Sequence, residues 1–308
     1  MAALADFPPR DKLNVGQWLG VSGAAFSTGI GRETSLGMSL LMGAANVRLG
    51  MWWESGLGTP GNGTIPFLPG RRHASDRLMR MAGSIFKTQR YLSYEFRARF
   101  YGTKRVWQYL SDGGHFENTA IYELLRSSRQ IQQIFACDNG ADPQYDFGDL
   151  GNLIRLAKID LGIEITLADP ASVRGDAQLR KVFGTPEDFG RCAGETNSRP
   201  CQDDADTASP CALLLYARRP DNSCIQIILI KPQLIADAPA DVRQYAKTHP
   251  RFPQEPTIDQ FFDEAQWESY RALGYDQARR IFNGAVLTAL EAHRGKYVVP
   301  AAKSVIRL

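Results

Sequence analysis

The feature that most constrains the fold is a strand, a glycine turn, a helix and a second strand, in that order, over residues 106–138. The run VWQYL is short and β-favouring, and it ends at the turn residues SDGG. Helical spacing of apolar residues begins near Glu117, and the run QIQQIFACD predicts a buried strand that closes at Asp138. This order predicts a βαβ unit, and hence an α/β fold with a mostly parallel sheet flanked by helices.

The chain continues with patterns that extend this fold. A helix is predicted over 147–162, because apolar residues recur there at three- and four-residue steps, and the run IEITLA that follows predicts a strand. The two apolar runs CALLLYARR and CIQIILIKP are joined by Pro-Asp-Asn-Ser, which predicts a β-hairpin excursion.

The end of the sequence is predicted to be helical over 257–293, as one helix at 258–273 and a second at 275–293. Phe261, Phe262 and Trp267 are expected to give the first of these helices its apolar side. A Cys-, Asp- and Pro-rich stretch at about 190–210 has no periodicity and predicts an exposed loop.

Two patterns in the first hundred residues resemble a membrane span and a nucleotide-binding motif, and neither fits its motif fully. The uncharged run at 34–47 is shorter than the ~20 residues needed to cross a bilayer, so it predicts a buried helix. The spacing Gly56-x-Gly58-x-x-Gly61 matches a dinucleotide fingerprint, but Pro60 and Pro66 oppose the helix that must follow it. No nucleotide, and no other cofactor, is therefore expected. The N-terminus lacks the pattern of a secretory signal, so a cytoplasmic location is expected.

Charge and cysteine content exclude further classes. The formal net charge of +3 comes from 36 basic and 33 acidic residues, so no field that would recruit nucleic acid is expected. The five cysteines contain no Cys-x-x-Cys pair, so reduced thiols are expected in place of a metal site, and a disulfide in the 192–224 region is the alternative. Asp138, Asp142 and Asp146 lack the spacing of a calcium loop and are interpreted as solvated loop carboxylates.

Asp112 is the candidate catalytic residue, because it follows the predicted strand at 106–110 where two glycines allow the backbone to turn sharply. A carboxylate in this place faces the open end of a sheet. The tripeptide Asp-Gly-Gly by itself more often forms only a turn.

The surrounding sequence resembles the bacterial patatin-like phospholipases. The similarity lies in LSDGGHFENTAIYELL, in the following ACDNGADPQYDFGDLGNLIRLAKIDLGIEI, in the upstream SGAAFSTGIG and NVRLGMWW, and in the downstream KPQLIADAPADVRQYAKTHPRFPQEPTIDQFFDEAQWESYRALG. These blocks cover most of residues 18–275 in the family's order. The layout is more distantly similar to the catalytic module of cytosolic phospholipases.

This resemblance implies a lipid acyl hydrolase with a Ser-Asp dyad, in which a serine attacks an acyl carbonyl and an aspartate takes its proton. Asp112 matches the base, and Gly113 and Gly114 match the turn that aims it. The family gives His115 no proton-transfer role, so a structural hydrogen bond is expected for it. Glu117 and Asn118 are expected to be cap or supporting residues.

Two elements of the family do not occur in this sequence, which has no Gly-Gly-Gly oxyanion loop and no strict Gly-x-Ser-x-Gly elbow. The nearest substitute is Gly20-Val21-Ser22-Gly23-Ala24, which makes Ser22 a candidate nucleophile. Against this, Ser22 and Ser27 fall in a block that matches a later segment of the family. The chain is thus expected to be the C-terminal portion of one patatin-like domain, incomplete on its N-terminal side.

Three hypotheses remain from the sequence. A partner chain or upstream segment supplies the serine and the oxyanion loop; or Ser22 acts with Asp112 in a self-sufficient hydrolase; or the chain is a non-catalytic interaction protein that keeps the fold. Membrane association through a region outside this chain, or through Met51, Trp52 and Trp53 at an interface, is also open, although a buried core position is favoured for these three residues.

Overall fold

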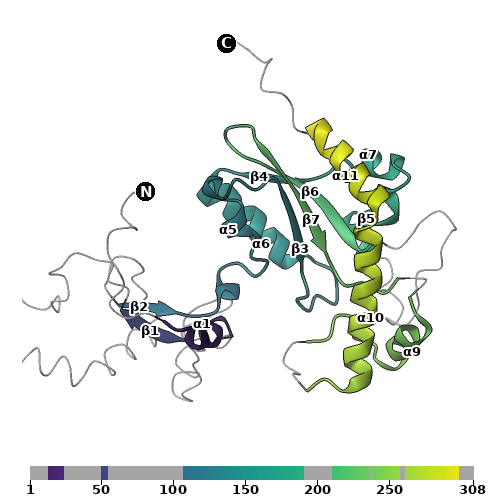
Figure 1. The fold of residues 1–308 in the computed structure, drawn as a ribbon, viewed down its shortest axis with the longest axis horizontal. Helices are drawn as coiled ribbons and strands as arrows, with labels where there is room; N and C mark the ends of the chain where they lie inside the picture. Colours follow the sequence, from purple (N-terminus) through teal and green to yellow (C-terminus); the bar gives the residue numbers. More distant parts are fainter. Residues whose placement is uncertain are drawn as a thin grey trace, which may run out of the picture. The chain divides into compact units, whose positions relative to one another are not determined.

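The computed structural model describes residues 13–23, 50–54, 107–190, 210–235, 238–256 and 261–297. The chain divides into two compact units, Met1–Asn118 and Thr119–Leu308, and each is described by itself (Figure 1). The predicted buried helix at 34–47 lies outside the described residues, as does nearly all of the predicted loop at 190–210.

The described residues of the first unit form an α-helix and a two-stranded antiparallel sheet. Helix α1 (Val15–Ser22) begins at Asn14, whose side chain and that of Gln17 form a capping box. Strand β1 (Met51–Glu54) pairs with β2 (Trp107–Leu110), and Met51 lies opposite Leu110. The Trp18 ring of α1 meets the Trp53 ring of β1 edge-on at a centroid distance of 6.4 Å. A 3-10 turn, η2 (Gly113–His115), follows β2.

The second unit is built from a sheet with helices on both faces (Figure 1). Its elements, in chain order, are α5 (Ile121–Leu124), the 3-10 turn η3 (Ser127–Arg129), β3 (Gln133–Cys137), α6 (Gly148–Leu156), the π-helical turn η4 (Ala157–Leu161), β4 (Glu164–Leu167), α7 (Pro170–Gly175), the 3-10 turn η5 (Leu179–Lys181), β5 (Phe183–Gly184), α8 (Pro186–Gly190), β6 (Ala212–Arg218), β7 (Cys224–Ile230), α9 (Ala240–Thr248), α10 (Glu264–Ile281) and α11 (Gly284–Tyr297).

The sheet of the second unit is mixed, with strand order β3-β7-β6-β4 and with β5 paired to β6. The pairs β3–β7 and β5–β6 are parallel, whereas β6–β7 and β4–β6 are antiparallel. The α/β class and the flanking helices are confirmed. The predicted βαβ unit is wrong, because β2 pairs with β1 in one sheet and β3 pairs with β7 in the other. Strands β2 and β3 do not share a sheet; β2 pairs with residues more than 50 positions earlier in the sequence, and β3 pairs with residues 93 positions later.

The predicted hairpin is confirmed, and it forms the centre of the sheet. Strands β6 and β7 pair antiparallel over their full lengths of 7 residues each, from Ala212 opposite Ile230 to Arg218 opposite Cys224. The backbone N–H of Arg219 donates to the carbonyl of Ser223 at 2.8 Å, which closes the turn, and Asn222 adopts the left-handed region at φ 65°. Asparagine tolerates this conformation better than most side chains.

Strand β6 is buried on both of its faces. Leu213 and Leu215 pack with α5 and α6 in one apolar cluster, whereas Leu214 and Tyr216 pack with α7 and α11 in a second. Each fully buried leucine contributes about 1.5–3 kcal/mol relative to an exposed one. The strands therefore read as nearly continuous apolar runs, since both sides need apolar residues.

The predicted helix over 147–162 is confirmed as α6 and η4, and the strand at IEITLA is confirmed as β4. The two C-terminal helices are confirmed with a different boundary. Helix α10 continues to Ile281, and the Asn283 side chain accepts a hydrogen bond from the backbone of Ala285 at 2.9 Å as α11 starts.

The predicted apolar side of the first C-terminal helix is wrong. Phe261 and Trp267 are 93% and 64% exposed, and the buried positions of α10 are instead Gln266, Ser269, Ala272, Leu273, Gln277 and Ile281. Polar residues are tolerated there because partners lie within reach; the Gln277 amide donates to the carbonyl of Gln233 at 2.8 Å.

The predicted solvated carboxylates at 138–146 are also wrong for Asp138. It follows β3, and its side chain is 5% exposed and lies 3.0 Å from the Nζ of Lys231, which follows the parallel strand β7 and is 2% exposed. Lys231 also donates to the carbonyl of Gly140 at 2.9 Å. The Asp142 carboxylate lies 3.9 Å from the same Nζ and accepts backbone hydrogen bonds from Asp146 and Phe147, at 3.0 and 2.9 Å. The ends of two parallel strands thus bring opposite charges together inside the protein.

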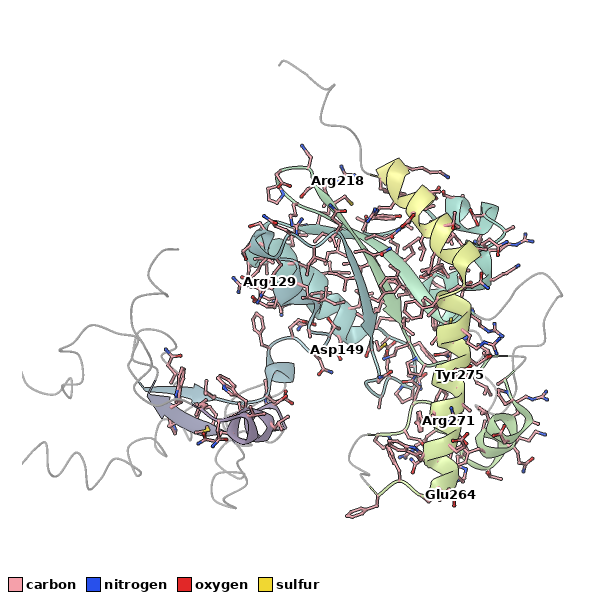
Figure 2. All side chains as sticks on the ribbon, viewed as in Figure 1. Arg129, Asp149, Arg218, Glu264, Arg271 and Tyr275 are labelled. Carbon is pink, nitrogen blue, oxygen red and sulfur yellow. The ribbon has the colours of Figure 1, made fainter. Side chains whose placement is uncertain are left out.

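We predict that Lys231→Ala destabilises the second unit by about 3 kcal/mol or more, because it leaves the Asp138 carboxylate buried without its cation. The measurement is the free energy of unfolding in urea. The matched control is Arg271→Ala, which removes an exposed ion pair with Glu268 (Arg271 in Figure 2) and is expected to change this free energy far less. Equal effects of the two substitutions would contradict the prediction.

Candidate functional site

Asp112 lies directly beyond β2, where it caps the 3-10 turn η2. Its side chain is partly buried, and Oδ1 accepts a hydrogen bond from the backbone N–H of Gly114 at 3.0 Å. Among the described residues, no donor reaches the second oxygen, Oδ2. The carboxylate is therefore held by one oxygen and keeps the other available to a proton donor.

The two glycines after Asp112 contribute differently to this turn. Neither has the positive φ that would require glycine. A side chain at Gly114 would place its Cβ 2.8 Å from the Asn118 Oδ1 and 3.5 Å from the Asp112 Oδ2, whereas Gly113 borders open space. Space beside the carboxylate, and not backbone conformation, is what glycine supplies at 114.

The His115 ring contacts the turn and not the carboxylate. Its Nδ1 lies 3.1 Å from the backbone carbonyl of Asp112 and 3.4 Å from the Ser111 hydroxyl. These contacts fit the structural hydrogen bond expected from the sequence. Glu117 is buried at 7% exposed, and its backbone N–H donates to the carbonyl of Gly113 at 3.0 Å, which extends the turn.

Ser22 is the last residue of α1 and is exposed, with Gly23 as the C-cap. A nucleophile elbow is a sharp turn from a strand into a helix, whereas Gly20, Val21 and Ser22 all lie within a helix. In the described part of the chain, no hydrogen bond joins Ser22 to Asp112. Ser27, the other serine of this block, lies outside the described residues.

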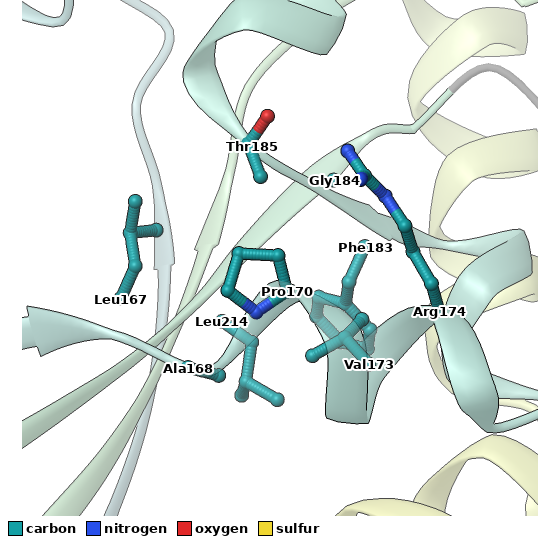
Figure 3. A pocket seen from close by; sticks show the side chains of 9 residues that line it. All are labelled: Leu167, Ala168, Pro170, Val173, Arg174, Phe183, Gly184, Thr185 and Leu214. Atoms are coloured by element: carbon teal, nitrogen blue, oxygen red, sulfur yellow. The ribbon is translucent and has the colours of Figure 1, made fainter.

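Two cavities are described, both in the second unit, and neither is lined by Asp112. The smaller lies between β4, α7 and β5 and is lined by residues that include Leu167, Pro170 and Arg174 (Figure 3). Its volume of about 10 Å³ holds one water at most and cannot take an acyl chain. The larger, of about 470 Å³, lies beside the β6–β7 turn.

A serine and a histidine that the sequence did not indicate meet in the second unit. The Ser172 hydroxyl in α7 lies 3.1 Å from the Nε2 of His293 in α11, and the His293 Nδ1 lies 2.7 Å from the Tyr216 hydroxyl. Such a pair invites comparison with a catalytic triad. The residues are 121 positions apart, so no local pattern could have shown it.

The hydrogen bonds around His293 select a tautomer that cannot act as a general base toward Ser172. The Gln226 amide nitrogen donates to the carbonyl of Leu290 at 3.1 Å and to the Tyr216 oxygen at 2.9 Å. The Tyr216 hydroxyl is then free to donate to Nδ1 of His293, which places the imidazole proton on Nε2, facing Ser172. A general base for that serine needs a lone pair on Nε2, so this network is structural.

The described residues include side chains that could ligate a metal ion, and cysteine thiols. In the described ranges, no group of three or more His, Cys, Asp or Glu side chains is placed to hold a metal ion. Cys137, Cys211 and Cys224 are free thiols, and burial raises the pKa of Cys211 to about 12. None of the described helices is both long and apolar enough to cross a bilayer.

The chain was compared with known proteins at the level of sequence and of structure. No protein-family model, no curated protein and no solved structure matches it.

We predict that Gly50→Ala loosens the β1–β2 pair that positions Asp112. An added Cβ would lie 2.5 Å from the Tyr109 ring and 2.7 Å from the backbone oxygen of Leu110, so the strands must separate. We expect a cost of about 1–3 kcal/mol, read as faster amide hydrogen exchange at 51–54 and 107–110. Gly113→Ala, which meets open space, is the control, and matching exchange in the two variants would contradict the prediction.

We predict that the stability of the second unit depends on pH through His293. Burial lowers the pKa of this imidazole below its ordinary 6.5, with Lys296 acting in the same direction and Asp176 and Asp169 opposing it. The folded state then binds fewer protons than the unfolded chain. The contribution is fully present above pH 6.5 and is lost as pH falls through the folded pKa.

The test compares urea unfolding of the natural chain and of His293→Gln between about pH 7.5 and 5.5. One proton corresponds to a slope of at most about 1.4 kcal/mol per pH unit. The variant is expected to show a shallower dependence, and an unchanged slope would exclude His293 as its source.

Proposed function

We propose that this chain carries the general base of a lipid acyl hydrolase of the patatin-like type, with Asp112 in that role. The observation that carries the proposal is the carboxylate itself: it stands directly beyond a strand, one oxygen is fixed by the Gly114 N–H, and the other accepts no hydrogen bond from the described residues. Gly114 leaves space beside it.

In the proposed reaction a serine hydroxyl adds to the acyl carbonyl while its proton passes to Asp112. The alcohol or lysolipid leaves with that proton, which gives an acyl-serine ester. Water then attacks the ester, gives its proton to Asp112, and the fatty acid leaves as the serine recovers its hydrogen. No histidine and no metal takes part in this scheme.

We further propose that the chain is the C-terminal portion of one patatin-like domain, incomplete on its N-terminal side, whose complete sheet is mostly parallel. The parallel pair β3–β7 and the helices on both faces of the sheet support this assignment. The serine and the oxyanion loop then come from an upstream segment or a partner chain, and the substrate is a lipid or another acyl ester. Attachment to a membrane would lie in that other region.

A second candidate function is a non-catalytic interaction protein that keeps the fold. One observation favours it over a self-sufficient hydrolase: Ser22 lies on an exposed helix end and not on an elbow. In that case the carboxylate of Asp112 would serve only to cap the turn at Gly113–His115.

We predict that Asp112→Asn lowers acyl ester hydrolysis by about 100-fold or more in the product of the whole coding region that contains this chain, because the amide cannot accept the serine proton. Hydrolysis of a short-chain p-nitrophenyl ester and labelling of serine by a fluorophosphonate are the two measurements. Asp146→Asn, which changes an exposed carboxylate, is the control.

Ser22→Ala separates the hypotheses. Activity that survives Ser22→Ala but not Asp112→Asn supports a nucleophile supplied from elsewhere, and the labelled peptide identifies it. Loss in both variants supports the self-sufficient hydrolase. Activity that survives Asp112→Asn overturns the proposed dyad, and absence of both hydrolysis and labelling supports the non-catalytic protein.

A further inference from the structure

The cavity of about 470 Å³ in the second unit is formed where three separate segments meet. The segment before β3 contributes Gln132, the β6–β7 turn contributes Arg219 and Ser223, and α11 contributes Glu291 and Arg294. Its volume falls in the range of small-molecule sites, roughly 300–1,000 Å³. All five of these side chains are polar or charged.

Arg219 is only partly satisfied in this cavity. Its Nε donates to the carbonyl of Leu125 and its Nη1 to the hydroxyl of Ser223, both at 3.3 Å, which is long for a hydrogen bond to a guanidinium. Its Nη2 is buried and has no hydrogen-bond partner. An unused charged donor in a buried place costs free energy, and an incoming acceptor can relieve that cost after a small rotation of the guanidinium.

Arg294 supplies a second cation from a different element. It is half-buried on α11, and within the described part of the chain its side chain forms neither a hydrogen bond nor an ion pair. Glu291, one turn earlier, is the acidic group among the lining residues and is exposed. Two guanidinium groups and one carboxylate leave an excess of positive charge at the cavity.

We propose that this cavity binds a phosphorylated small molecule, with Arg219 and Arg294 on its phosphate. A phosphate carries close to two negative charges at neutral pH and presents several acceptor oxygens, so it can engage both guanidinium groups, whereas a carboxylate carries a single charge. The Ser223 hydroxyl and the Gln132 side chain add neutral polar groups. The cavity is larger than a phosphate ion, which leaves space for an organic substituent.

The inferred role is binding and not covalent chemistry. Cys224 is the lining thiol, and burial raises its pKa, so it stays protonated and poorly nucleophilic at neutral pH. The site does not depend on the proposed function, because Asp112 takes no part in it.

The test is calorimetric titration of the full chain with glycerol 3-phosphate as the probe. We expect saturable binding with a dissociation constant below about 1 mM, weakened about tenfold or more by Arg294→Gln, since a charge-assisted hydrogen bond contributes on this scale. Arg219→Lys keeps the charge but loses the planar fork, and should also weaken binding.

Arg218→Gln is the matched control. Arg218 ends β6 next to Arg219, is exposed and does not line the cavity (Figure 2), so its loss should change the dissociation constant by less than about twofold. Unfolding of each variant in urea is measured in parallel, and Arg294→Gln serves if Arg219→Lys fails to fold.

A second arm identifies the source of the phosphate. Vesicles that contain phosphatidic acid in phosphatidylcholine are tested for co-sedimentation with the chain and for competition by glycerol 3-phosphate. Competed binding to the vesicles supports a lipid headgroup, and binding of the soluble probe alone supports a free phosphorylated molecule. The proposal would be overturned if the chain binds neither probe, or if Arg294→Gln leaves the binding unchanged.

Discussion

The pairing of β6 with β7 is the interaction on which the described second unit depends. Both strands lie in the interior of the sheet, and β6 packs against helices on each face. Removal of this hairpin would leave β3 and β4 without a partner. It would also take from both apolar clusters the side chains that β6 contributes. The turn of the same hairpin carries Arg219, and the end of β7 leads to Lys231, so its register also places the polar groups discussed above.

The central hairpin brings polar side chains into the interior, and most of them form hydrogen bonds or ion pairs there. Tyr216 and Gln226 lie opposite each other in the β6–β7 pair and share a hydrogen-bond network with His293. Lys231 is neutralised by Asp138. Buried polar groups normally find partners in this way. Arg219 and Gln233 depart from this pattern, since each has buried side-chain atoms without a hydrogen-bond partner among the described residues. Arg219 carries a charge and lines the larger cavity, which is why that cavity is assigned a ligand.

The two proposed sites rest on different kinds of observation. Asp112 belongs to a short turn in the first unit, and its assignment combines local geometry with a resemblance that spans several sequence blocks. The phosphate site belongs to the second unit and rests on cavity volume, charge and an unsatisfied donor. Failure of either proposal leaves the other standing.

The sequence by itself determined the local structure: the hairpin, the helix over 147–162, β4, and the capped turn at Asp112 follow from periodicity and turn residues, which act over a few positions. Only the tertiary structure decided which strands flank the hairpin, that Asp138 is buried against Lys231, that Trp267 is exposed, and that Ser172 meets His293. These outcomes depend on contacts between residues tens of positions apart. Such contacts are selected by the packing of whole elements, and no local pattern encodes them.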